Sequence, residues 1–218
     1  MLFTTVEVRW FRCGEVPEPL RDWFLEERAH VTEEPPRVDH YLLVTATDGL
    51  GIKYREGRME VKQRSAAPRV VSFGGGAVGT VARWRKWSFP LAAAVEARET
   101  LDAHGAWWAV KKSRLLRDYR IDVDGAIIPV SESNGPEARC SVELSQVEVI
   151  GQRWWTLGFE ASGPPATLSE SLERVTRYIL RRMATALDAS SGSSGADFLG
   201  RDISFGYPRW LQELAEST

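Results

Sequence analysis

The sequence lacks several features that would assign it to a class at once. It has only two cysteines in 218 residues, Cys13 and Cys140, which lie far apart and do not have the spacing of a zinc site. We therefore expect no disulfide framework and a reducing compartment. No run approaches the roughly 20 apolar residues of a membrane-spanning helix. The opening MLFTTVEVRWF has no signal-peptide pattern. These absences predict a cytoplasmic protein with no membrane partner.

An excess of charge of one sign is also missing. The net charge is −2, so no global basic field draws the chain to nucleic acid, and any basic patch must be local. The glycine-rich segment 73–79 lacks the Gly-Lys-Ser/Thr ending of a phosphate-binding loop. Because a strand pattern follows this segment, we expect a hairpin tip there.

What the sequence does contain is a series of strands. Hydrophobic residues make up 43% of the chain, enough for a sizeable core. Tight turns are predicted at 55–58 and 150–152. The predicted fold class is α+β, an eight-stranded antiparallel β-barrel (a tunnel) with covering helices. Eight segments alternate with the period of two typical of strands: Thr4–Phe11, Asp39–Ala46, Gly51–Glu56, Arg58–Ser65, Thr80–Phe89, Ala106–Ile121, Arg139–Ile150 and Gln152–Ala161.

Three segments have helical spacing instead: Pro17–Glu27, Pro90–Ala103 and Thr167–Leu187. Residues 1–188 are expected to form the barrel domain, and the Ser-Gly-rich residues 189–195 a flexible link. Residues 196–218 form an aromatic tail, which we expect to dock on the domain.

Long charged side chains recur on one face of the strands. Glu7 and Arg9 share a face, while Val6 and Val8 share the other. A solvated outer face of an antiparallel sheet explains such a pattern in the simplest case. The cations outnumber the acids, however, and such an excess repels itself unless water or an anion lies among them. If the face turns inward, it lines a cationic tunnel, and the apolar outer face then needs the helices and the tail as cover. The cations are Arg9, Lys53, Arg55, Lys62, Arg64, Arg83, Arg85, Lys112 and Arg114, against Glu7, Glu60, Glu143 and Glu160.

The ordered series of these motifs resembles the CYTH superfamily, the triphosphate tunnel metalloenzymes. The similar segments are Glu7-Val8-Arg9, Ile52–Gly57, Glu60–Arg64, Lys112-Ser113-Arg114, Val142-Glu143-Leu144 and Phe159-Glu160-Ala161. The resemblance implies an eight-stranded barrel that hydrolyses or cyclises triphosphates with the help of Mg²⁺ or Mn²⁺. The family's first strand carries Glu-x-Glu-x-Lys, whereas Thr5 stands here in place of the first acid and Arg9 in place of the lysine.

The leading hypothesis is a metal-dependent phosphohydrolase that acts on a triphosphate or on inorganic polyphosphate. The alternatives are a non-catalytic barrel that binds phosphate or another anion, and a structural barrel with solvated charges. The partner is a phosphorylated small molecule or polyphosphate, and the oligomeric state stays open. Glu7, Glu60 and Lys62 are the expected catalytic residues, and Glu7, Glu60, Glu143 and Glu160 the expected ligands of Mg²⁺ or Mn²⁺. The expected phosphate-binding residues are Arg9, Lys53, Arg55, Lys62, Arg64, Arg85, Lys112 and Arg114.

Overall fold

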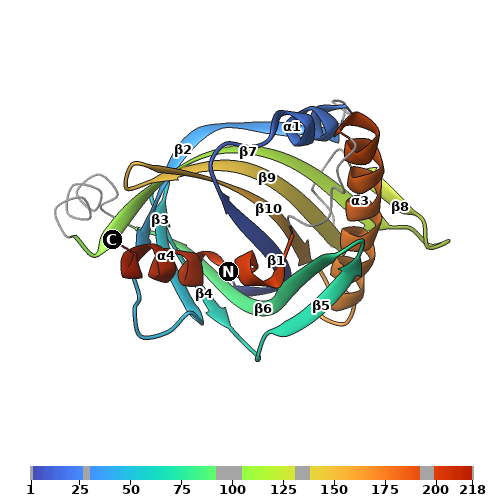
Figure 1. Ribbon diagram of the computed structural model, residues 1–218. Coiled ribbons are helices and arrows are strands. Elements are labelled where there is room, and N and C mark those ends of the chain that lie inside the picture. The colour runs from blue at the N-terminus through green and yellow to red at the C-terminus, as the bar shows by residue number, and fades with distance from the viewer. Residues whose placement is uncertain (1, 27–29, 92–104, 131–137, 192–198, 218) are drawn as a thin grey trace.

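The structure is a computed structural model, which describes residues 2–26, 30–91, 105–130, 138–191 and 199–217. In this part of the chain, eight antiparallel strands close into a barrel in the order β1-β10-β9-β7-β2-β3-β4-β6, and β6 pairs with β1 (Figure 1). The predicted fold class is therefore confirmed. The barrel strands are β1 (Leu2–Cys13), β2 (Thr32–Leu42), β3 (Leu50–Arg55), β4 (Arg58–Arg64), β6 (Ala77–Pro90), β7 (Trp107–Ile121), β9 (Arg139–Val149) and β10 (Gln152–Ser162).

Two short strands extend this sheet, and neither was predicted. β5 (Arg69–Gly74) pairs with β6, and β8 (Ile127–Val130) pairs with β7. The turn between β5 and β6 contains Gly74, Gly75 and Gly76, all with positive φ, so the glycine-rich segment is a hairpin tip as predicted.

The two tight turns also lie where the sequence predicts them. Glu56 and Gly57 join β3 to β4 with φ values of 48° and 76°, and Ile150 and Gly151 join β9 to β10 with 45° and 75°. Two successive positive φ values suit the right-handed twist of the flanking strands. These turns fix which residues face each other in both hairpins.

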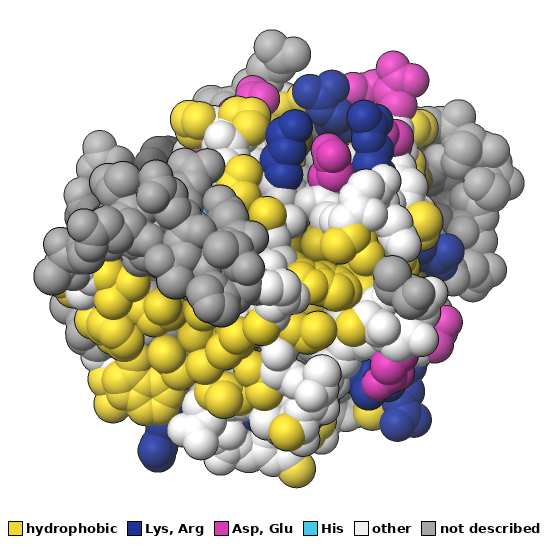
Figure 2. Space-filling view, turned by 90° about the vertical axis from the view of Figure 1, so that its left-hand side faces the viewer, with side chains coloured by type: hydrophobic (Ala, Val, Ile, Leu, Met, Phe, Trp, Pro, Cys, Tyr) yellow, Lys and Arg dark blue, Asp and Glu magenta, His cyan; other side chains and the backbone are white. Residues whose placement is uncertain are grey.

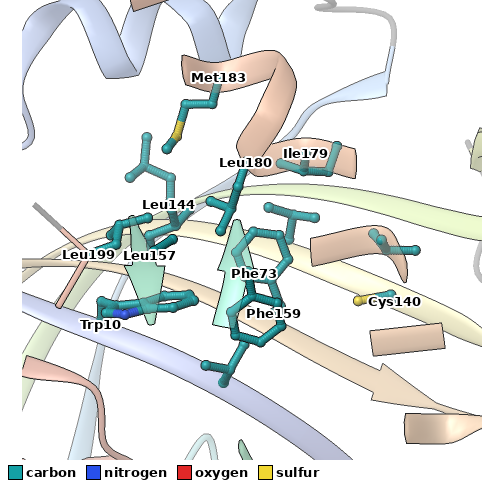
Figure 3. Packing of buried hydrophobic residues seen from close by; sticks show 14 of the residues in the cluster. Trp10, Phe73, Cys140, Leu144, Leu157, Phe159, Ile179, Leu180, Met183 and Leu199 are labelled. Atoms are coloured by element: carbon teal, nitrogen blue, oxygen red, sulfur yellow. The ribbon is translucent and has the colours of Figure 1, made fainter. Parts of the chain in front are cut away.

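Helices α1 (Glu18–Leu25) and α3 (Leu168–Ser191) lie together on one side of the barrel (Figure 1). The predicted apolar stripe of α3 is buried and includes Leu172, Val175 and Ile179. It packs on the outward-facing residues of β1, β9 and β10, among them Trp10 and Phe159, whose rings meet edge to face (Figure 3). This layer is the main hydrophobic core.

The ends of the predicted helices differ in part from the structure. α3 continues to Ser191, so the first residues of the predicted link 189–195 are helical. Residues 192–195 of that link lie outside the described residues, as do residues 92–103 of the predicted helix Pro90–Ala103.

The α1 helix ends on a buried cation. The Arg117 guanidinium, on the outer face of β7, donates hydrogen bonds to the carbonyl oxygens of Trp23 and Phe24. These carbonyls lie in the last turn of the helix, where the regular bonds from four residues ahead end and where the helix dipole favours positive charge. The Trp23 carbonyl also accepts the Glu26 backbone N–H at 3.3 Å. Arg117 therefore holds α1 on the outer face of the barrel and does not line the interior.

The C-terminal helix α4 (Tyr207–Glu216) closes one end of the barrel, behind a 3-10 turn at Arg201–Ile203. Trp210 stacks on the inward-facing Phe11 at a centroid distance of 4.8 Å, and Leu211 and Leu214 complete this second apolar cluster. We expected the tail to help cover the outer face of the sheet. The structure places it inside the barrel mouth because its aromatic side chains continue the apolar inner end of the strands.

The outer face of β2, β3, β4 and β6 carries an apolar row set by the strand register. Leu42, Ile52, Val61 and Trp87 are successive cross-strand partners. They are partly exposed, and hydrophobic side chains gather on the side of the molecule where β3 lies (Figure 2). In the described part of the chain, no helix combines the length and apolar character needed to cross a lipid bilayer.

Candidate anion-binding site in the barrel

The strand register shows which charged residues share the barrel interior. Directly opposed residues of neighbouring strands lie on the same face of a sheet. Glu7 is opposite Glu160, Lys53 is opposite Glu60, and Lys62 is opposite Lys86. The charged face therefore turns inward. The predicted residues that it holds are Glu7, Arg9, Lys53, Arg55, Glu60, Lys62, Arg64, Lys112, Arg114, Glu143 and Glu160.

Two of the predicted phosphate-binding residues lie apart from the others. Arg64 is at the edge of the barrel, where its Nη2 is 2.6 Å from Oδ1 of Asp48. Arg85 is an exposed residue of the outer face, opposite Gln63, so its predicted place in the interior was wrong. The alternation of cations with Trp84 in β6 did not reveal which set faces inward. The register with β4 places Trp84 and Lys86 inside.

Several interior residues were not predicted: Glu34, Arg37, Asp39, Tyr41, Lys86 and Tyr207. The position of Asp39 could be predicted from the sequence, because it lies in a predicted strand where it alternates with His40. Glu34 and Arg37 were not, since the pairing of β2 with β7 is irregular between them, around Pro35 and Pro36. Such an irregularity breaks the period of two on which the prediction depends.

Ten interior residues form one ion-pair network, which we call the surplus network. Asp39 is its centre, fully buried, with Lys53 and Lys112 each 3.3 Å from its Oδ2 and Arg37 3.2 Å from its Oδ1. In the described residues it contains six cations and four carboxylates, so it carries a net charge of +2. They are Arg9, Arg37, Lys53, Arg55, Lys112 and Arg114, with Glu34, Asp39, Glu60 and Glu143.

A second network on β1, β4, β6 and β10 is neutral. The ammonium group of Lys62 contacts Glu7 and lies 3.4 Å from Oε2 of Glu160, while that of Lys86 lies 2.8 Å from Oε1 of Glu160. Like charges directly opposite each other, as Lys62 and Lys86 are, destabilise a sheet. The Glu160 carboxylate lies between them and offsets this repulsion.

The surplus positive charge appears in the pKa values of two lysines. Burial lowers the pKa of Lys53 and of Lys112 to about 8, although Asp39 acts in the opposite direction on both. Lys112 lowers the pKa of Lys53 further. Burial alone would raise the pKa of Asp39, but Lys112, Lys53 and Arg37 hold it well below its ordinary value. The interior therefore contains two lysines that gain stabilisation from any additional negative charge.

Arg9 is fixed at the closed end of the barrel. Its Nη1 donates to Oε1 of Glu143 at 2.7 Å and to Oγ1 of Thr156 at 2.8 Å. A Cβ atom at Gly158 would lie 2.5 Å from its Cζ, so the absence of a side chain at 158 makes room for the guanidinium. Beside it, Lys112 Nζ donates to the Tyr41 hydroxyl at 2.7 Å and lies 3.7 Å from the centre of the Tyr207 ring. This end of the interior is filled by the protein itself.

Solvent access increases away from α4. The side chain of Lys112 is 4% exposed, whereas Lys53, Lys86 and Arg55 are 18%, 23% and 26% exposed. Lys53 and Arg55 lie toward the turn between β3 and β4, whereas Lys62 and Lys86 oppose each other further along β4. These four side chains are the partly exposed cations that a ligand can reach.

The expected metal ligands do not form a ready metal centre. Within the described ranges, no three His, Cys, Asp or Glu side chains gather in a way that could hold a metal ion. Glu7, Glu60, Glu143 and Glu160 each contact lysine or arginine. Thr5, at the place of the missing acid, is buried, and its hydroxyl has no hydrogen-bond partner among the described residues. Dependence on Mg²⁺ or Mn²⁺ stays a prediction.

Comparison with known proteins gives distant structural similarities. No family model matches the chain, and no curated protein matches it. Among solved structures, the PH1819 protein from Pyrococcus horikoshii OT3 is 13% identical with a TM-score of 0.42, and the alignment covers 98% of this chain and 99% of that chain. A candidate adenylate cyclase (bh2851) from Bacillus halodurans is 12% identical with a TM-score of 0.37, over 82% of this chain and 90% of that chain.

Proposed function

We propose that this protein binds a phosphorylated small molecule or a short oligophosphate inside its barrel. One observation carries the proposal: the surplus network holds two more cations than carboxylates in a partly enclosed interior. Uncompensated charge in such surroundings is costly, and an anion that enters would remove the cost.

The side chains suit phosphoryl oxygens in particular. Arginine presents several N–H donors in a planar fork that matches phosphate, and lysine adds a mobile point charge. Lys53 and Arg55 on β3 and Lys86 on β6, the two strands that flank β4, offer both kinds of donor. Because charge-assisted hydrogen bonds are stronger than neutral ones, such a group favours phosphate over uncharged ligands.

Calorimetric titration with inorganic phosphate, pyrophosphate, tripolyphosphate and ATP at low ionic strength tests this proposal. The chain offers a matched pair of variants in adjacent positions. Lys86→Met removes an interior cation, whereas Arg85→Met removes a cation from the outer face of the same strand. We expect Lys86→Met to weaken binding of at least one of these ligands about tenfold and Arg85→Met to leave it unchanged.

Two results would contradict the proposal. The first is no binding of any of the four ligands by the folded wild-type protein. The second is an equal loss of affinity in both variants, which would indicate a diffuse electrostatic effect instead of an interior site. Near-ultraviolet circular dichroism of the tryptophans checks that each variant is folded.

Phosphohydrolysis is the second candidate function. The CYTH resemblance implies it, and Glu7 and Glu160 are direct cross-strand neighbours on the inner face, where they could act on a bound phosphate. Phosphate release from tripolyphosphate, ATP and thiamine triphosphate, with and without Mg²⁺ or Mn²⁺, tests it. Release that is lost in Glu160→Gln supports hydrolysis, while binding without turnover leaves anion binding as the function.

A further inference from the structure

Two carboxylates in the accessible part of the barrel contact pairs of cations in the same way. Oε2 of Glu60 is 3.1 Å from Lys53 Nζ, and its Oε1 is 2.7 Å from Arg55 Nη2. Glu160 repeats the arrangement, with Oε2 3.4 Å from Lys62 Nζ and Oε1 2.8 Å from Lys86 Nζ. In each carboxylate the two oxygens therefore contact two different cations.

An entering anion can also displace the carboxylates of these two glutamates from their cations. Their side chains are 18% and 28% exposed, whereas Asp39, the centre of the surplus network, is fully buried. Because the Glu60 and Glu160 carboxylates are partly exposed, water can hydrate them when their cations bind another anion. Asp39 has no such replacement and must keep its cations.

From these contacts we propose that Glu60 and Glu160 occupy the places of a ligand's phosphoryl oxygens, and that a phosphoryl dianion displaces them from their cations without a divalent metal ion. This inference rests on the proposed binding of a phosphorylated ligand. Two oxygens of one phosphoryl group replace two carboxylate oxygens at a pair of cations. The glutamates are then internal competitors of the ligand, not metal ligands.

The charge of the interior indicates the size of the ligand. The surplus network carries +2 and the second network is neutral, so one group of charge −2 balances these two networks. A phosphate monoester carries about −1.5 to −2 at pH 7. A triphosphate brings more negative charge than the cations can balance, and this excess would need a metal ion. The ligand class is therefore a monophosphate.

Neutralising the glutamates separates this inference from the metal-dependent alternative, because the two predict effects of opposite sign. If the carboxylates compete with the ligand, Glu60→Gln and Glu160→Gln strengthen phosphate binding. If they hold a metal ion that bridges to phosphate, the same variants weaken it. The matched control is Glu173→Gln, which removes the same charge from an ion pair with Arg69 on the outer surface.

The experiment is a calorimetric titration of the full chain with inorganic phosphate in the presence of EDTA. Each glutamine variant is expected to bind phosphate about fivefold more tightly than the wild type, and Glu173→Gln to match the wild type. Wild-type affinity is expected to be the same with EDTA as with Mg²⁺. Tripolyphosphate is expected to bind no more tightly than phosphate.

Weaker binding by Glu60→Gln, or phosphate binding that requires Mg²⁺, overturns the inference while the proposed function stands. Failure of the wild type to bind any phosphate compound overturns both. A titration with Mn²⁺ alone, read by electron paramagnetic resonance, measures the affinity for the metal ion in the absence of phosphate. Tight Mn²⁺ binding that is lost in Glu60→Gln also overturns the inference. If Glu160→Gln does not fold, Glu60→Gln decides the question.

Discussion

Raising the pH from 7 to 10 is expected to weaken the binding of inorganic phosphate. Burial lowers the pKa of Lys53 and of Lys112 to about 8 in the free protein. A bound anion favours their charged form and raises both pKa values, so the complex holds protons that the free protein loses above pH 8. The part of the affinity that depends on these two lysines is therefore full well below pH 8 and falls as the pH rises through it.

The size of the effect follows from the number of lysines that must be charged. Each required proton costs about a factor of ten in affinity per pH unit above its pKa. Because a lysine with a pKa of about 8 is already half uncharged at pH 8, we expect a loss of about 15-fold between pH 8 and pH 9.5 if one lysine is required, and the square of that if both are. Neighbouring charges stay constant, because the pKa of Asp39 is held well below its ordinary value and that of Lys86 is raised.

Calorimetry in two buffers of different ionisation enthalpy measures both the affinity and the protons taken up. The second ionisation of inorganic phosphate lies near neutral pH, so the slope is read from pH 8 upward, where the ligand is almost wholly the dianion. Lys53→Arg is the control, because arginine keeps its charge throughout this range and the slope should fall by one. A dissociation constant that stays flat from pH 7 to 10 would refute the reasoning.

Three further predictions concern the fold around the site. Gly158→Ala puts a Cβ atom 2.5 Å from the Arg9 guanidinium and should lower the free energy of unfolding in urea by about 3 kcal/mol, whereas Gly105→Ala, where no atom lies within 4 Å, should change it little. Trp210→Ala removes the ring that stacks on Phe11 and should lower the free energy of unfolding by about 3 kcal/mol. Faster proteolysis of α4 would show that the helix is released. An unchanged digestion pattern would argue against α4 as the closure of the barrel. Because the folded pKa of Asp39 is depressed, its contribution to stability is complete above its unfolded pKa, near 3.9, and is lost as the pH falls toward the folded value. The free energy of unfolding in urea should therefore be lower at pH 3 than at pH 5. Asp39→Asn should reduce this difference.

The sequence was most informative where a local rule decides the structure. The period of two located seven of the eight barrel strands and put Glu7, Lys53 and Lys62 on one face. The predicted strand Asp39–Ala46 overlaps β2 only at its end, Asp39–Leu42. Gly57 and Gly151 marked tight turns because two-residue hairpins need positive φ. The stripe of α3 followed from helical spacing in the same way.

The sequence was least informative where contacts between segments far apart in the chain determine which residues face the interior. Arg85 and Lys86 are adjacent cations, and only the pairing of β6 with β4 places Lys86 inside. The excess of cations over acids in the interior was also overestimated, because Arg85 lies outside and because Glu34 joins the interior from a part of β2 whose pattern is broken. The insertion of α4 into the barrel mouth depends on Phe11, almost 200 residues away along the chain.

A crystal structure of the protein with inorganic phosphate tests the central claim most directly. We predict phosphate density inside the barrel within hydrogen-bond distance of Lys53 or Lys86, and the Glu60 or Glu160 carboxylate turned away from the cation that the phosphate occupies. An interior with every ion pair unchanged at saturating phosphate, or density confined to outer-face residues such as Arg85, would contradict the account.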